Sequence, residues 1–535
     1  MNYFKLLVEN KKKSNIRKMM RGYRILKERN ELDLLSKVKY DISCLRLNPK
    51  NHFLFNQFSD SLSNNNFELI LRQYLIVRFA NISFNINLLI SINNKKRLLI
   101  HPMPIEWREL LESYGFRCST FYNKLIWNFY LFLYFIHGIY KTSLYFIYGL
   151  FILVCNKQNN NKLKNSIYFA NLEKNNFCFV KKKKNGVISW FQSYFSDKNE
   201  YYISTHSVKN DKIDQNIYYV YDDVPFPDNI FEYIIHFLFF LVHILFSFIN
   251  WLRGNYSHLI LFNDISKSLF ISNSKKNYLP KIYLFHNSNW IYKPLWTYAA
   301  EKKGAKIYFY FYATNVEEYE TNIKISYKKN FWHIISWDNF FVWNDYQKNF
   351  ILRSVNYPVN LEIVGPISFR ADNSNYKQCL PKNSLVIFDI QPRRSSVYQT
   401  LGLDNEYYIS NTCCRFLLDI YNTATIYNFI VVLKQKRKID SLQDKSYLQL
   451  INKLKLNSNF ILINEDVAPE ILINDAKLVI SMPFTSTAII AESFKKPSFF
   501  YDTNQIINKN DKAAHGIYII SGLNELSTTL KKFES

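Results

Sequence analysis

Glycine is scarce in this sequence, which has 11 glycines among 535 residues. Loops that cradle a pyrophosphate or a triphosphate depend on glycine, because a backbone without Cβ atoms can come close to the phosphates. The sequence has no G-x-G-x-x-G turn, no G-x-x-x-x-G-K-[ST] loop and no H-E-x-x-H helix. These absences disfavour an NAD-dependent enzyme and a P-loop ATPase.

Cysteine pairs and metal-binding patterns are also lacking. The seven cysteines are irregularly spaced and form no C-x-x-C pair, so we expect no disulfide framework and a reducing, cytoplasmic environment. No convincing D-x-D motif is present, because Asp222 and Asp223 are adjacent. The sequence therefore predicts no metal site. Residues Met1–Lys5 do not lead into an apolar run with a cleavage site, so no signal peptide is expected.

Acidic residues are outnumbered, with 43 Asp and Glu against 68 Lys and Arg, and the formal net charge is +25. The basic residues are densest at Lys11–Arg29 and Lys181–Lys184. A solvated basic face would account for this balance, and so would an anionic partner such as a membrane surface or a small anionic molecule. No nucleic acid is expected as a partner, because no zinc-finger spacing or other nucleic-acid motif is present.

Two long apolar segments lie in the first half of the chain, at 125–155 and 234–252, and the second carries no formal charge. Stretches of about 18–20 apolar residues are long enough to cross a bilayer. The mean hydropathy of −0.19 argues against a polytopic membrane protein. Three interpretations remain open: a monotopic or re-entrant anchor, buried core helices, or one or two true spans.

The pattern of apolar runs divides the chain into three regions. Residues 1–90 are basic and predicted to be helical, whereas 371–535 alternate strands and helices in the manner of a doubly wound parallel sheet. The intervening residues 91–370 predict a second Rossmann-like domain. That domain contains both apolar segments and a polar insertion at 156–228. The fold class is therefore α/β.

The expected elements of the two Rossmann-like domains follow from apolar runs, proline turns and glycine caps. The expected strands are Arg97–His101, Lys281–His286, Lys306–Tyr312, Phe340–Trp343, Glu362–Val364, Ser384–Asp389, Asn428–Leu433, Phe460–Asn464, Lys477–Ile480 and Ser498–Tyr501. The expected helices are Ile105–Tyr114, Ile291–Lys303, Ser410–Tyr421, Leu442–Leu454, Ala468–Asp475, Thr485–Phe494 and one near Leu523–Phe533.

The most informative segment is Leu478–Ala488, where an apolar run stops at Ser481 and a proline turn leads into a helix. A strand that turns directly into a helix points the unpaired N–H groups of the helix start at the turn, and this arrangement binds phosphate. Thr485, Ser486 and Thr487 add hydroxyl groups at the same place. A simple helix N-cap is the alternative, although one cap requires fewer hydroxyls.

Ser481–Thr487 resembles the Pro-Phe-Thr-Ser motif of a group of bacterial surface-polysaccharide biosynthesis proteins. The resemblance covers roughly Lys281 to the end, and more faintly Arg97–Trp127. Further segments that fit the family are Lys293–Tyr298 with Tyr310–Asn315, Val364–Ile367 and Phe388–Pro392. The resemblance implies a GT-B fold, in which two Rossmann-like domains face each other across a cleft. It also implies sugar transfer from a nucleotide-sugar donor, without a metal or another cofactor.

The donor-binding candidates lie in the C-terminal domain, where the carboxyl ends of parallel strands line the ligand crevice. The expected ligands are Ser481, Thr485, Ser486 and Thr487 for the phosphate, Lys434 and Arg437 as a second phosphate contact, and Asp389, Gln391 and Glu492 for the nucleotide. Lys434 replaces the His-Pro pair that GT-B proteins often carry after this strand. A solvated basic loop, a loop-capping Asp389 and a surface Glu492 are the corresponding structural alternatives.

Acceptor-side candidates follow two strands of the N-terminal domain. His286 closes one strand and Glu317 comes after the next, so each is a candidate for the general base that takes the proton of the acceptor hydroxyl. A structural role is the alternative for His286. Trp290 and Trp296 could stack on sugar rings, with core packing as the alternative, and the loop at His515 could close over the donor.

The sequence therefore predicts a glycosyltransferase of surface-polysaccharide assembly at the cytoplasmic face of the inner membrane, peripheral or held by a hydrophobic hairpin. The acceptor would be a lipid-linked or growing glycan. The hydroxyl-rich turn is similar to the serine/threonine motif of sialyl- and Kdo-transferase-like GT-B proteins, which suggests a CMP-linked acidic sugar as donor. A non-catalytic GT-B scaffold and an integral membrane export component are the two alternatives.

Overall fold

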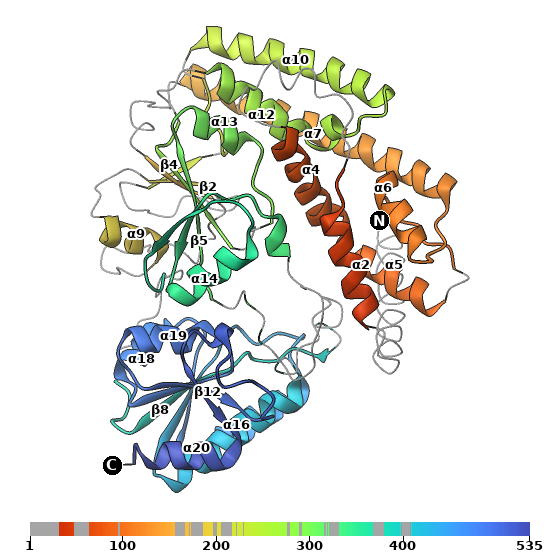
Figure 1. The fold of residues 1–535 in the computed structure, drawn as a ribbon. Helices are drawn as coiled ribbons and strands as arrows, with labels where there is room; N and C mark the ends of the chain where they lie inside the picture. The colour runs from red at the N-terminus through yellow and green to blue at the C-terminus, as the bar shows by residue number, and fades with distance from the viewer. Residues whose placement is uncertain are drawn as a thin grey trace.

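The computed structural model contains two parallel β-sheets, one in the middle of the molecule and one in the domain that carries the C-terminus (Figure 1). The chain is therefore a mixed α/β protein with two Rossmann-like sheets, as the sequence predicts. The structure describes residues 32–47, 64–94, 97–155, 166–170, 172, 186–195, 201–204, 217–220, 222–227, 229–274, 279–287, 291–314, 317, 319, 331–367, 379–395, 397, 407 and 409–534. The basic runs Lys11–Arg29 and Lys181–Lys184 lie outside these residues.

The first sheet has seven parallel strands in the order β3-β2-β1-β4-β5-β6-β7. Its strands are β1 Ile167–Phe169, β2 Tyr201–Ser204, β3 Ile217–Val220, β4 Ile282–His286, β5 Lys306–Tyr310, β6 Asn339–Val342 and β7 Asn360–Ile363. The segment expected to be a polar insertion thus supplies β1, β2 and β3. Helices α9 (Val187–Phe195), α13 (Trp296–Lys302) and α14 (Asp345–Ser354) and the 3-10 helix η3 (Phe331–Ile334) connect or flank the strands.

The second sheet has six parallel strands in the order β10-β9-β8-β11-β12-β13. They are β8 Ser384–Phe388, β9 Ile430–Lys434, β10 Phe460–Ile463, β11 Leu478–Ser481, β12 Ser498–Asp502 and β13 Tyr518–Ser521. The helices of this domain are α16 Ser410–Ile426, α17 Lys445–Leu454, α18 Pro469–Asp475, α19 Ser486–Ser493 and α20 Gly522–Lys531, with a 3-10 turn η5 at Lys512–Ala514. The five strands predicted here are confirmed, and β13 is an additional strand.

Helices α2 (Leu32–Cys44), α4 (Asn64–Phe79), α5 (Ile82–Asn93) and α6 (Ile105–Ser113) precede the first sheet. The strand predicted at Arg97–His101 is wrong, because only Leu99 pairs, in an isolated bridge with Cys118. Side-chain amides take the place of a neighbouring strand: Asn123 accepts from the His101 N–H and donates to the Leu99 carbonyl. This segment therefore stays outside the seven-stranded sheet.

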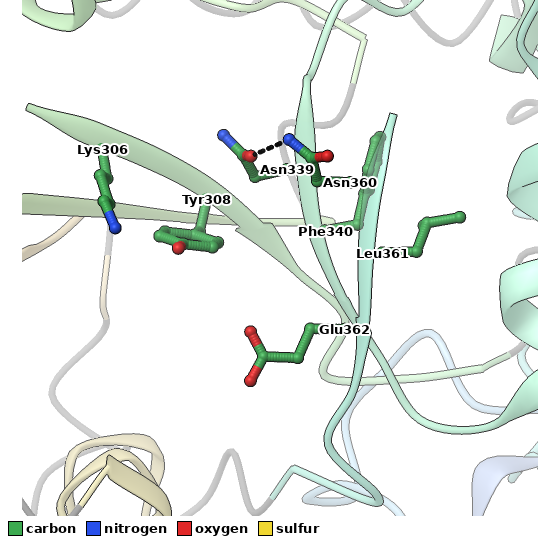
Figure 2. Close-up of a pocket in the computed structure, with 7 residues that line it drawn as sticks. All are labelled: Lys306, Tyr308, Asn339, Phe340, Asn360, Leu361 and Glu362. Atoms are coloured by element: carbon green, nitrogen blue, oxygen red, sulfur yellow. Dashed lines mark hydrogen bonds between the residues drawn. The ribbon is translucent and has the colours of Figure 1, made fainter. Parts of the chain in front are cut away.

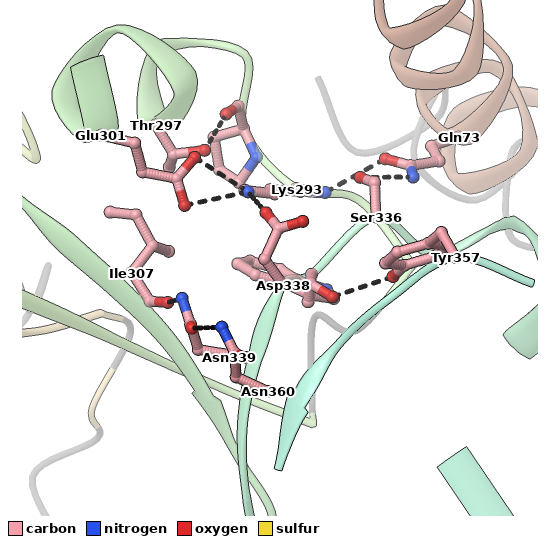
Figure 3. A network of polar contacts seen from close by, with 12 residues as sticks. Gln73, Lys293, Thr297, Glu301, Ile307, Ser336, Asp338, Asn339, Tyr357 and Asn360 are labelled. Carbon is pink, nitrogen blue, oxygen red and sulfur yellow. Dashed lines mark hydrogen bonds and ion pairs between the residues drawn. The ribbon is translucent and has the colours of Figure 1, made fainter. Parts of the chain in front are cut away.

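A buried polar network ties α4 to the first sheet (Figure 3). The Gln73 side chain donates to the Ile334 carbonyl at 2.7 Å and to the Ser336 hydroxyl at 2.9 Å, and it accepts from the Lys293 N–H at 3.2 Å. The Lys293 ammonium, whose side chain is fully buried, contacts Asp338 at 2.7 Å and Glu301 at 3.0 Å. Helix α4 is thus bound to the N-terminal domain, at the residues that precede α13 and β6.

Helices α7 (Thr120–Cys155), α10 (Ile230–Leu252), α11 (Ser257–Ile260) and α12 (Phe262–Asn273) form the outer side of this domain, at the end opposite the C-terminal domain (Figure 1). Among the described residues, α7 and α10 are long and apolar enough to cross a membrane. Helices α4 and α5, which meet at a bend of 75°, would make a third candidate if they are counted as one broken span. The two apolar segments seen in the sequence are therefore single continuous helices.

Candidate functional site

The carboxyl ends of the two sheets meet, and hydrogen bonds join them directly. Thr314 follows β5, and its N–H donates to the Ser486 hydroxyl at the start of α19 at 2.9 Å. Asn344 follows β6, and its side-chain oxygen lies 3.0 Å from Nδ1 of His515. Because ligands of parallel α/β sheets bind at the carboxyl ends of the strands, this junction is the candidate functional site.

The turn between β11 and α19 is built around Phe484, which has a φ of 61°. This left-handed conformation is uncommon for a residue with a large side chain, and stacking holds it in place. The Phe484 ring lies 4.8 Å from that of Tyr319, at an interplanar angle of 3°, and 5.7 Å from that of Phe500. Tyr319 belongs to the N-terminal domain, so the turn is held partly from across the junction.

The four predicted phosphate ligands of this turn come together. The Ser481 and Thr487 hydroxyls are 3.0 Å apart, and the Thr485 hydroxyl donates to the Met482 carbonyl at 2.8 Å. The Thr485 side chain makes no capping hydrogen bond to the start of α19. The helix start therefore keeps N–H groups that its own N-cap residue does not satisfy, beside three partly exposed hydroxyl residues.

The basic loop after β9 is tied into the protein. The Lys434 ammonium donates to the carbonyls of Gln435 at 2.9 Å and Glu465 at 3.2 Å. The Gln391 side-chain amide forms two hydrogen bonds with the Arg437 backbone, each of 2.8 Å. The Arg437 guanidinium donates to the Ile390 carbonyl at 3.0 Å. Both cationic groups that the sequence assigned to a second phosphate contact are therefore hydrogen-bonded to backbone carbonyls, and their role toward phosphate stays a prediction.

The remaining nucleotide-binding candidates occupy different places. Asp389 is buried after β8, where it accepts hydrogen bonds from the Tyr447 hydroxyl and the Gln391 N–H. Burial raises the pKa of the Asp389 carboxyl, and the bond from Tyr447 opposes that shift. Glu492 is exposed near the other end of α19, about 9 Å along the helix axis from Ser486. Asp389 and Gln391 therefore shape the edge of the site, and Glu492 lies away from the turn.

The two general-base candidates differ in their surroundings. His286 ends β4 and is buried, with ring centroids 5.8 Å from Tyr310 and 5.7 Å from Tyr312. Glu317 lies between Thr314 and Tyr319, and both of these residues contact the turn between β11 and α19. One of its carboxylate oxygens pairs with Arg353, and its other, buried oxygen has no hydrogen-bond partner among the described residues.

Electrostatics also distinguish Glu317. Burial raises the pKa of its carboxyl, and Arg353 opposes this shift. A raised pKa brings a carboxylate closer to the range in which general bases work. His515, on the other side of the junction, is kept neutral: burial lowers its pKa to about 4, with Arg353 acting in the same direction.

The other sequence candidates are structural or not described. Trp296 is fully buried, with its ring 5.2 Å from that of Tyr283, so core packing is the correct interpretation. Trp290 lies outside the described residues. Within the part of the chain that the structure describes, no group of three His, Cys, Asp or Glu side chains could hold a metal ion.

Sequence reasoning missed the residue that shapes the loop after β12. The fully buried Asp502 accepts hydrogen bonds from the N–H groups of Asn504, Gln505, Ile506 and Ile507 and from the Tyr407 hydroxyl. This loop leads to His515 at the junction. An aspartate at a strand end followed by Thr503 and Asn504 is a typical turn signal, and it could have identified this position.

A hollow of about 570 Å³ lies elsewhere, over β5, β6 and the edge strand β7 of the first sheet (Figure 2). It is lined by Lys306, Tyr308, Asn339, Phe340, Asn360, Leu361 and Glu362. Lys306, Asn339 and Asn360 are the first residues of their strands, so the hollow begins at the amino ends of β5, β6 and β7. It is therefore separate from the carboxyl-end junction.

Comparison with solved structures gives distant likenesses. UDP-GlcNAc 2-epimerase from Methanocaldococcus jannaschii is 11% identical with a TM-score of 0.36, over 68% of this chain and 91% of that one. A variant of the wall teichoic acid polymerase TagF soaked with CDPG is 11% identical with a TM-score of 0.36, over 76% and 88%. Phytolacca americana UGT2 with UDP-2-fluoroglucose and pterostilbene is 9% identical with a TM-score of 0.35, over 69% and 90%.

Sequence comparison identifies the family. No curated protein matches this sequence. Residues 237–530 match the family described as "Polysaccharide biosynthesis PFTS motif protein". The matched region exceeds half of the chain, and it contains the stacked turn Pro483–Ser486 together with both edges of the junction. The chain therefore belongs to the PFTS-motif family of polysaccharide biosynthesis proteins.

Proposed function

We propose that this chain is a glycosyltransferase of surface-polysaccharide assembly, which transfers a sugar from a nucleotide-sugar donor to a lipid-linked or growing glycan. Family membership supports the pathway class, and the two sheets that meet at their carboxyl ends support a GT-B type of enzyme. The observation that carries the proposal is the turn from Ser481 to Thr487. It places hydroxyls and the start of α19 opposite Thr314 of the other domain.

In this proposal the turn holds the leaving phosphate. Backbone N–H groups at the start of α19 and the hydroxyls of Ser481, Thr485, Ser486 and Thr487 would stabilise the charge that develops as the glycosidic bond to the donor breaks. Glu317 would take the proton of the acceptor hydroxyl, because its neighbours Thr314 and Tyr319 contact the turn and one of its carboxylate oxygens has no hydrogen-bond partner among the described residues. His286 is the alternative base.

The donor class and the location are finer parts of the same proposal. The hydroxyl-rich turn favours a CMP-linked acidic sugar as donor. The excess of basic residues favours a place at an anionic membrane surface, on the cytoplasmic face of the inner membrane, where lipid-linked acceptors are available. No metal or other cofactor and no nucleic acid is part of this proposal.

A nucleotide thermal-shift panel tests the donor site. The full chain would be melted with CMP, CDP, UMP, UDP, GDP, dTDP and ADP, and we expect stabilisation by the nucleotides of one base. Ser486→Ala should weaken the binding of that nucleotide by roughly 1.5–3 kcal/mol, the usual contribution of a hydrogen bond to a charged group. This corresponds to an increase in Kd of about tenfold or more.

Ser493→Ala is the matched control, because it removes the same hydroxyl group from the far end of α19, where the Ser493 hydroxyl donates to the Ile490 carbonyl at 2.7 Å. It should leave nucleotide affinity unchanged. The melting temperature without nucleotide separately reports the loss of the contact between Ser486 and Thr314. A folded chain that no nucleotide stabilises would contradict the proposal and favour the non-catalytic scaffold.

A further inference from the structure

Helices α7 and α10 present an unusual concentration of exposed apolar side chains. Among the described residues, 26 of the 42 large hydrophobic side chains that are exposed belong to these two helices. On α10 the exposed residues are Ile230, Phe231, Ile234, Ile235, Phe237, Leu238, Leu241, Val242, Leu245, Phe248, Ile249 and Leu252. We call the exposed faces of α7 and α10 together the outer apolar face. A surface of this extent marks a binding site for a protein or a membrane.

The polarity of α10 is inverted relative to a helix on a water-facing surface. Its buried stripe is His236, Phe240, His243, Ser247 and Asn250, so most of its polar residues point inward. Nδ1 of His243 lies 2.9 Å from the hydroxyl of Ser266, which belongs to α12. Nε2 of His236 lies 3.2 Å from the hydroxyl of Ser274, which directly follows α12. A helix that hides its polar side and exposes its apolar side is suited to lipid rather than to water.

Packing argues against α10 crossing a bilayer. The buried stripe runs along most of the helix and faces α11 and α12. Helix α12 has 12 residues and is about 18 Å long. On α12, Lys267 pairs with Asp222 at 2.7 Å, and Asp264 accepts a hydrogen bond from Tyr292. If α10 crossed the hydrocarbon core, these charged groups and the sheet behind them would be carried into it.

Helix α7 supports the same orientation. Its 36 residues extend about 54 Å, whereas the hydrocarbon core is about 30 Å thick. Lys141 is exposed near the middle of α7 and Lys124 near its start. Side chains of this kind reach the headgroups easily from a helix that lies in the membrane plane, but not from the centre of a span.

We propose that the outer apolar face is a monotopic membrane anchor, with α7 and α10 lying flat in one leaflet of a lipid bilayer. This deepens the membrane location given above and rests on that part of the proposed function. Exposed Lys124, Lys141 and Arg253 border the face, and anionic headgroups would neutralise them. A second copy of the chain on the same face would instead bring these cations together.

Vesicle flotation tests the lipid occupant. The purified full chain should float with vesicles of phosphatidylcholine and phosphatidylglycerol. The double variant Leu238→Glu/Leu245→Glu, at positions that are 55% and 67% exposed, should bind at least about tenfold more weakly, because it removes two leucines from the buried area. Leu456→Glu, at a position that is 86% exposed in the C-terminal domain, is the matched control and should float like the parent.

Two outcomes would overturn this assignment. Equal flotation of the double variant and the parent would remove the outer apolar face from the membrane. Light scattering that finds a dimer for the parent and a monomer for the double variant, with no flotation of either, would make the face a self-association surface. The nucleotide shift of the double variant is read in parallel, and its retention separates a failed anchor from a failed donor site.

Labelling distinguishes a flat helix from a span. Asn229→Cys and Arg253→Cys place a thiol just beyond each end of α10, at exposed polar positions that are not part of the outer apolar face. On vesicle-bound protein, a membrane-impermeant maleimide added outside should label both positions, above the background of the parent chain. Protection of one end until detergent is added would show that α10 crosses the bilayer, and the in-plane orientation would be wrong.

Discussion

Replacing Lys293 with methionine tests the buried network that joins α4 to the first sheet. The ammonium lies 2.7 Å from Asp338, 3.0 Å from Glu301 and 4.3 Å from the centroid of the Tyr298 ring. Methionine keeps most of the apolar stem and removes only the charge. Removing one partner of a buried ion pair costs about 3–5 kcal/mol.

The exposed fractions of the two carboxylates lower this figure. The side chain of Glu301 is 26% exposed and that of Asp338 is 49% exposed, so water can partly solvate both after the change. We therefore expect a loss of about 2–3 kcal/mol in the free energy of unfolding of the N-terminal domain.

The loss should also depend on pH. Burial raises the pKa of the Glu301 carboxyl, and Lys293 opposes that shift. Without Lys293 the carboxyl would hold its proton to higher pH in the folded state than in the unfolded state. A raised folded-state pKa contributes stability at low pH that is lost as pH rises through it. The variant should therefore lose less stability in acid than above neutral pH.

Urea unfolding followed by tryptophan fluorescence measures this change, because Trp296 and Trp337 are fully buried in the same domain. Lys306→Met is the control. It removes an exposed lysine of β5, and a surface change of this kind usually costs no more than about 0.5 kcal/mol. A Lys293→Met variant as stable as Lys306→Met would refute the reasoning.

Three further predictions concern the junction. Glu317→Gln should lower the transfer rate by about 100-fold or more while the thermal shift with nucleotide stays unchanged; a variant with normal turnover would remove Glu317 as the base. Burial lowers the pKa of His515 from 6.5 to about 4, so the contribution of the neutral imidazole to folding stability is complete above pH 6.5 and is lost as pH falls toward 4. Between these pH values the melting temperature should fall less steeply for His515→Gln than for the parent chain. Parallel curves for the two proteins would contradict a buried, neutral His515. Phe484→Gly should be about 1 kcal/mol more stable than Phe484→Ala in urea, since both lose the ring but only glycine relieves the positive φ; equal stabilities would show that no strain is stored there.

The C-terminal domain could be predicted strand by strand. The predicted strands Ser384–Asp389 and Phe460–Asn464 each match an observed strand within one residue. Their sequences are short apolar runs bounded by polar residues, as expected of strands buried on both faces of a parallel sheet. Strand β13 was not predicted, because it has only four residues between a loop and a helix and lacks a longer run of apolar residues.

The N-terminal domain depends more on tertiary contacts. Strands β1, β2 and β3 have three or four residues each, which is too short for a period to be recognised in an Asn- and Lys-rich segment. Their parallel pairing with β4 and with each other defines them as strands. The helix predicted from Ile291 begins only at Trp296, after Pro294, whose ring suits the residues before a helix better than its interior.

The site was predictable in its local parts and not in its assembly. The apolar strand, the proline turn and the three hydroxyl residues indicate a strand–turn–helix unit, and the structure has one at β11 and α19. The contact between Thr314 and Ser486 joins residues far apart in sequence, and no local pattern encodes it. The same holds for Lys434, whose ammonium is directed to two backbone carbonyls by the way its loop folds.

The layering of the N-terminal domain sets a distance between a bilayer and the site. Helix α10 packs on α12, α12 on α13 and α13 on β5, and the C-terminal domain lies at the opposite end of the molecule (Figure 1). With α7 and α10 in a leaflet, two helix diameters, on the order of 20 Å, separate the lipid from the sheet. A single lipid-linked sugar could not reach across that gap, whereas a longer glycan could. If the chain transfers sugars as proposed, the domain would then act as a spacer that admits only chains already begun, and the protein would extend polymers rather than start them.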